Sequence, residues 1–124
     1  MTKLSNIRLE LARDQEFPEG SRSRGYQLIA PLDQLGHLDQ EAWKKMRDKC
    51  RVKRFWAGEP DEIGHFVHKR GGVWAFDYDP KSEADDENGF KLDKHVFKPG
   101  EYVSFQEQDG VMRAFRIVSV VEMD

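Results

Sequence analysis

Hydrophobic and polar residues alternate along much of this chain, and such alternation is typical of half-buried β-strands. In residues 7–12 (IRLELA), isoleucine or leucine occupies every second position and charged residues lie between them. The alternation resumes in residues 26–32 (YQLIAPL) after a stretch rich in glycine and proline, residues 14–25, which we expect to be a loop. Pro31 has no amide hydrogen to donate, so this second strand should end there or lie at an edge.

One stretch, residues 39–50, has the period of an α-helix instead. Asp39 can cap its first turn. Trp43, Met46 and Cys50 follow at spacings of three and four, which places them on one helical face, while lysine and arginine fill the other positions. We therefore expect an α-helix with one buried stripe.

Two β-hairpins are predicted in the second half of the chain. In residues 64–79, a three-residue turn that ends at Gly72 would place aromatic residues opposite each other, pairing Phe66 with Phe76 and His68 with Trp74.

The other hairpin spans residues 100–121, and its turn contains Asp109 and Gly110. A three-residue loop with Gly110 in the left-handed conformation puts Val103 opposite Phe115 and gathers the apolar side chains on one face. A two-residue turn would divide them between two faces, so we expect the longer loop.

About seven short strands and one α-helix near residues 39–50 predict a mainly β (α+β) fold. We expect a small barrel or a strongly bent antiparallel sheet, with the helix covering one opening. A length of 124 residues suits one domain, residues 1–124, and eight Phe, three Trp and three Tyr provide large side chains for a core.

Composition indicates where in the cell the protein is expected. The single cysteine, Cys50, excludes an internal disulfide, and the first thirteen residues lack the basic start and apolar run of a secretory signal. No apolar run approaches the ~20 residues that a membrane-spanning helix needs. We therefore expect a cytoplasmic protein that does not enter the membrane.

The formal net charge is only -3, yet residues 41–56 hold seven basic residues against two acidic ones. Such a segment can attract phosphate groups, and an aromatic side chain beside it can stack on a base. The alternative is a solvated helix face followed by a strand, since lysine and arginine are good helix formers. The candidate binding residues are Lys44, Lys45, Arg47, Lys49, Arg51, Lys53, Arg54 and Trp56.

Charge of the opposite sign gathers in residues 77–88, which contain six acidic residues and one lysine. This stretch does not fit a calcium-binding loop, because the positions that require glycine and glutamate hold Ser82 and Asn88. It is predicted to be an exposed loop. The basic face of one molecule and the acidic loop of another could also meet in a homo-oligomer or with a protein partner.

An aromatic row in the hairpin of residues 64–79 offers a second kind of site. It could line a pocket for a planar ligand, with the histidine and the tyrosine as polar or acid-base groups. Core packing explains the same row with fewer assumptions. The residues of this alternative pocket are Phe66, His68, Trp74, Phe76 and Tyr78.

Cofactor and metal signals are missing from the sequence. His65 and His68 are three apart in a predicted strand and should point to opposite faces, and Cys50 has no cysteine partner at zinc spacing. No Gly-rich nucleotide loop or nucleophile elbow is present. The segment GSRSRG, Gly20 to Gly25, could contact phosphate through its arginines, although a polar loop is the commoner meaning. We expect no metal and no cofactor, and binding is favoured over catalysis.

Three segments, CRVKRFWAGEPDEIGH, WAFDYDP and FKPGEYVSFQEQDG, together resemble a family of small uncharacterised bacterial proteins of about this length. The resemblance implies a stand-alone bacterial protein rather than a fragment. It implies no activity and identifies no functional residues.

Overall fold

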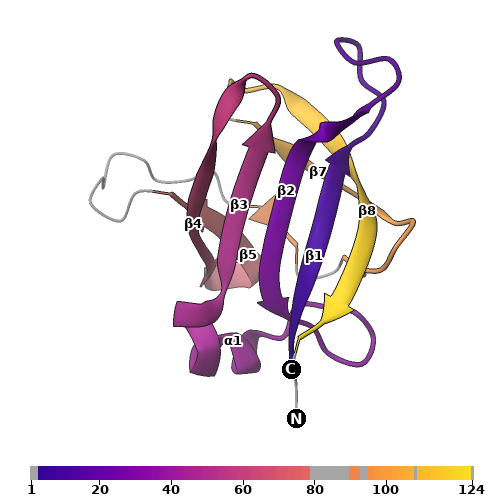
Figure 1. Ribbon diagram of the computed structural model, residues 1–124. Coiled ribbons are helices and arrows are strands. Elements are labelled where there is room, and N and C mark those ends of the chain that lie inside the picture. Colours follow the sequence, from indigo (N-terminus) through magenta and orange to yellow (C-terminus); the bar gives the residue numbers. More distant parts are fainter. Residues whose placement is uncertain (1–2, 79–89, 93–94, 108, 124) are drawn as a thin grey trace.

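The computed structural model describes residues 3–78, 90–92, 95–107 and 109–123, which form one antiparallel sheet of eight strands, one helical segment before β3 and a short 3-10 turn (Arg70–Gly72) between β4 and β5. The strand order is β6-β5-β4-β3-β2-β1-β8-β7. The sheet curls into a half-barrel, so the bent-sheet form of the predicted mainly β fold is confirmed (Figure 1). The strands are β1 (Leu4–Leu11), β2 (Ser21–Pro31), β3 (Arg51–Trp56), β4 (Glu59–Lys69), β5 (Val73–Asp77), β6 (Phe90–Lys91), β7 (Tyr102–Gln106) and β8 (Met112–Glu122).

The helix lies at one end of the half-barrel (Figure 1). The α-helix α1 (Gln40–Met46) continues as a 3-10 turn (Arg47–Lys49), and the Asp39 carboxylate accepts a hydrogen bond of 3.0 Å from the amide of Ala42. Trp43 is buried and its indole N–H donates to the carbonyl of Phe66 at 2.8 Å. The predicted cap and the burial of Trp43 are confirmed. The last turn tightens to 3-10 geometry because the chain enters β3 directly afterwards.

Both predicted hairpin registers are confirmed. Phe66 pairs with Phe76 and His68 with Trp74 between β4 and β5. Val103 pairs with Phe115 between β7 and β8, and Gly110 has the expected left-handed conformation, with φ of 84°. The strand that was predicted to end at Pro31 also ends there.

The beginning of β2 differs from the prediction. Residues 14–25 were expected to form a loop, but β2 begins at Ser21 and its first residues extend the hairpin with β1. The strands come unusually close where the register shifts between Glu10 and Leu11, and a Cβ atom at Gly25 would overlap the carbonyl of Leu9. Glycine is required here for close approach of two backbones, whereas the sequence pattern indicated only a loop.

Large aromatic rings fill the concave side of the sheet. The Tyr26 ring centroid lies 5.1 Å from that of Phe76, 5.3 Å from Phe105 and 5.2 Å from Phe115. Phe66 stacks on Trp74 at 5.0 Å. These contacts join strands from both halves of the sheet, so the core fixes its curvature. No helix within the described ranges is long and apolar enough to cross a bilayer.

Candidate functional site

The basic segment of residues 41–56 occupies α1, the 3-10 turn and β3. The Lys44 ammonium lies 3.7 Å from the Glu41 carboxylate, and the Arg47 guanidinium lies over the Trp43 ring at 5.4 Å. In the part of the chain that the structure describes, four other cations have no carboxylate oxygen within 4.0 Å, namely Lys45, Lys49, Arg51 and Lys53. These four positive charges are therefore not balanced by a direct ion pair.

Arg51 and Lys53 lie on the outer face of the sheet, the side opposite the core. Val52, between them, is fully buried. Because two residues of an extended strand span about 7 Å, Arg51 and Lys53 follow each other along this face at about that spacing. On the neighbouring β4, His65 pairs with Arg51 and Ile63 pairs with Lys53, and Ile63 is 62% exposed. We call Lys49, Arg51 and Lys53 the basic strip.

Arg54 was included among the predicted binding residues, but it points into the core. Its side chain is only 7% exposed. Two of its nitrogen atoms donate to Oε1 of Glu107, at 2.9 and 3.1 Å, and a third donates to Glu59 at 3.1 Å. Because side chains along β3 alternate between the two faces of the sheet, Arg54 points to the core side, as Val52 does. Arg54 therefore stabilises the fold and is not part of an outer binding surface.

Trp56 was expected to stack on a base, yet other residues of the protein already surround its ring. The Arg54 guanidinium lies 4.4 Å from the ring centroid, and Phe17 packs edge-on at 6.3 Å. Arg24 and Arg113 lie within 5.9 and 5.8 Å of the same centroid. Trp56 is thus a packing centre at the end of the half-barrel opposite α1.

Glu107 connects this end to the aromatic core. Its side chain is 3% exposed, and it accepts hydrogen bonds from Arg54 and from the Tyr26 hydroxyl. Burial, together with the nearby negative charge of Glu107, raises the pKa of Tyr26 far above its usual value. Burial disfavours the charged form of Arg54, but the bonds to Glu107 outweigh it and the pKa of Arg54 is raised.

A second buried arginine lies nearby. Arg113, with a side chain 3% exposed, donates to Asp14 and to Glu16, both at 2.7 Å. Hydrogen bonds from the backbone of Glu16 and from Arg113 lower the pKa of Asp14. The bonds of Arg113 to Asp14 and Glu16 join the β1–β2 loop to β8, so we regard this group as stabilising the fold.

Sequence reasoning missed these buried ionic groups although the strand pattern contained them. The charged residues share the inward positions of buried apolar residues in the same strand pattern: Arg113 those of Phe115 and Ile117, Glu107 that of Phe105, and Arg54 that of Val52. A charged residue at an inward position of a strand predicts a buried ion pair. Which partner it meets depends on how distant strands approach each other, and no local pattern encodes that.

The aromatic row of the alternative pocket lies largely in the core. Phe66, Trp74 and Phe76 are 0%, 1% and 4% exposed, and His68 contacts Trp74 with ring centroids 4.8 Å apart. Core packing accounts for these rings. The Trp74 indole N–H and the Tyr78 hydroxyl are buried without a hydrogen-bond partner among the described residues. The ligand pocket stays a prediction.

The remaining candidate chemistry is limited. Cys50 is fully buried, and burial raises the pKa of its thiol to about 11. His65 and His68 are three positions apart in β4 and point to opposite faces, as expected. Within the described residues, no group of three His, Cys, Asp or Glu side chains is placed to hold a metal ion. Most of the acidic stretch, residues 79–88, lies outside the described residues.

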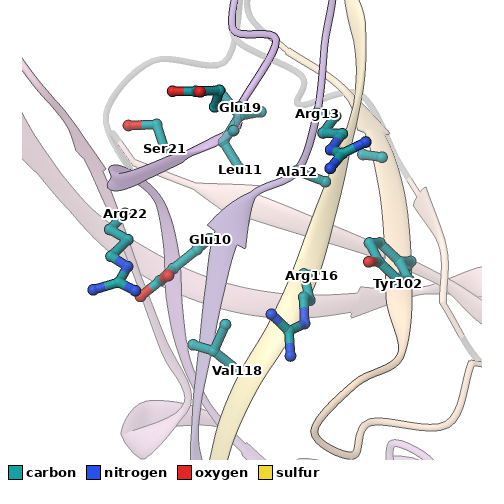
Figure 2. Close-up of a pocket in the computed structure, with 12 residues that line it drawn as sticks. Glu10, Leu11, Ala12, Arg13, Glu19, Ser21, Arg22, Tyr102, Arg116 and Val118 are labelled. Carbon is teal, nitrogen blue, oxygen red and sulfur yellow. The ribbon is translucent and has the colours of Figure 1, made fainter.

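A cleft on the outer face was not predicted. It has a volume of about 620 Å³ and lies between the β1–β2 connection and strands β7 and β8 (Figure 2). Its lining includes Glu10, Arg13, Glu19, Arg22, Tyr102 and Arg116. The sequence contained one related signal, because Arg22 belongs to the GSRSRG segment that was considered for phosphate contact.

Comparison of the chain with models of protein families, with curated proteins and with solved structures gave no match. The resemblance to a family of small bacterial proteins therefore stays a prediction.

Proposed function

We propose that this protein is a binding module that contacts a polyanion, such as single-stranded nucleic acid, through the basic strip of Lys49, Arg51 and Lys53. The observation that carries the proposal is the division of the cations into two groups. Arg54 and Arg113 are buried and form ion pairs with carboxylates, whereas the basic strip has no ion-pair partner among the described residues.

Electrostatics favours a polyanion at such a surface. Each lysine or arginine that neutralises a phosphate releases counterions condensed around the nucleic acid, and this release contributes affinity. The neighbouring Ile63 is an exposed apolar side chain beside Lys53, and it offers contact area for a base. Single-stranded nucleic acid combines both kinds of group, repeated along a flexible chain.

A charge-neutralising variant tests the proposal. K49Q/R51Q/K53Q removes three positive charges from the basic strip. The matched control K3Q/R70Q/K98Q removes three charges from exposed positions elsewhere, so both variants have the same net charge. Binding of a fluorescently labelled single-stranded oligonucleotide is measured by anisotropy at low salt.

The strip variant should bind more weakly than the control, and its affinity should depend less on salt by about two units of log–log slope, since each lost contact to a single strand removes ~0.7. Equal affinities of the two variants would refute the basic strip as the contact surface.

A further inference from the structure

The cleft beside strands β7 and β8 is separate from the basic strip. Its volume of about 620 Å³ lies within the range of ~300–1,000 Å³ that small-molecule sites occupy. The floor is formed by the end of β1 and the first half of β8, and the β1–β2 connection rises along one side (Figure 2).

Positive charge predominates in this cleft. Three arginines line it, Arg13, Arg22 and Arg116, and none of them has a carboxylate within 4.0 Å among the described residues. Of the two carboxylates in the lining, Glu10 already accepts a bond of 2.9 Å from Arg8. The cleft therefore has an unbalanced positive charge that suits an anion.

The arginines differ in their surroundings. Figure 2 shows the Arg22 side chain pointing toward Glu10 on the β1–β2 side of the cleft. Arg13, at the start of the β1–β2 connection, and Arg116, on β8, lie away from Glu10 and Glu19, and no carboxylate is drawn near them (Figure 2). A guanidinium presents a planar fork of donors that matches a phosphate group. Arg13 and Arg116 are thus the groups expected to contact the anion.

Tyr102 adds an aromatic surface. It is the cross-strand partner of Arg116, and the two side chains stand next to each other on the outer face. Tyr102 is 58% exposed and lines the cleft, so its ring is accessible to a ligand bound there. A planar ring could stack on the phenol while an attached phosphate contacts the arginines.

From these features we infer that the cleft binds a small ring-bearing organic phosphate of the nucleoside monophosphate class, with the phosphate at Arg13 and Arg116 and the ring on Tyr102. The inference does not rest on the proposed polyanion contact, because the two sites share no residue.

The test uses adenosine monophosphate as the probe, with adenosine and inorganic phosphate as comparison ligands, in isothermal titration calorimetry. The variants are R116Q, R13Q and Y102A, each checked by circular dichroism for an unchanged fold. R51Q/K53Q serves as a control that alters the basic strip alone.

Adenosine monophosphate should bind more tightly than either comparison ligand. R116Q or R13Q should weaken it by about tenfold, the low end for a charge-assisted hydrogen bond. Y102A should also weaken it, and the strip control should not. The inference is overturned if the probe does not bind, if adenosine or phosphate binds as well, or if the cleft variants bind like the unchanged protein. R13Q keeps the test valid if R116Q fails to fold.

Discussion

Replacing Glu107 with glutamine should destabilise the fold strongly, because the change leaves the Arg54 guanidinium charged and buried without its main partner. Both side chains are almost inaccessible, at 7% exposure for Arg54 and 3% for Glu107. Removal of one member of a buried ion pair costs about 3–5 kcal/mol. Glu59, at 3.1 Å, would still neutralise part of the arginine charge, so we expect about 3 kcal/mol.

The assay is unfolding in urea, followed by tryptophan fluorescence, for the unchanged protein and for E107Q. The matched control is E101Q, which neutralises an exposed glutamate near β7 and should change stability by less than about 0.5 kcal/mol. If E107Q unfolds at the same urea concentration as E101Q, the Arg54–Glu107 pair does not stabilise the fold and the reasoning is refuted.

Replacing both partners offers a second check on the same pair. The double variant R54M/E107L removes both charges, and replacement of a buried pair by apolar residues is often close to neutral. It should therefore be more stable than E107Q alone. A double variant that is less stable than E107Q would mean that the pair is required for more than its mutual charge compensation.

Three further predictions concern stability and reactivity. The Cys50 thiol, with its pKa raised to about 11 by burial, should react with a thiol reagent at pH 8 only after the protein unfolds, and rapid labelling of the folded protein would contradict its burial. Burial raises the pKa of Tyr26 and Tyr78 in the folded protein. Their contribution to stability is therefore complete below about pH 10, the tyrosine pKa of the unfolded chain, and is lost as the pH rises above that value. Ultraviolet titration should leave two of the three tyrosines unionised while the protein stays folded. At Gly64 a Cβ atom would overlap the carbonyl of Asp77, so G64A should cost more stability than G58A, where no atom lies within 4 Å and only the positive φ of 86° opposes alanine; equal costs would contradict the close approach of these strands.

The sequence predicted the local parts of this fold well, because alternation and turn chemistry are local signals. The register between Phe66 and Phe76 follows from one turn, and the helix cap follows from Asp39 alone. Register within a hairpin is set by the hydrophobic pattern and the loop length, both of which are visible in the sequence.

Parts that depend on distant contacts were not predicted. The beginning of β2 was assigned to a loop, because the tight approach of Gly25 to Leu9 arises only when β1 is in place. Arg54 was assigned to a binding surface because neighbouring cations suggested one, although its place in the strand directs it inward to Glu107. The cleft joins residues from the first 22 positions to strands near the C-terminal end, and no spacing along the chain relates them.

The most direct test of the central claim is the salt dependence of single-stranded oligonucleotide binding by the unchanged protein, measured by fluorescence anisotropy. Three contacts from the basic strip predict that affinity falls with rising salt with a log–log slope of about -2. An absence of binding even at about 20 mM salt, where phosphate contacts are strongest, would contradict a polyanion-binding function and leave Lys49, Arg51 and Lys53 as a solvated face.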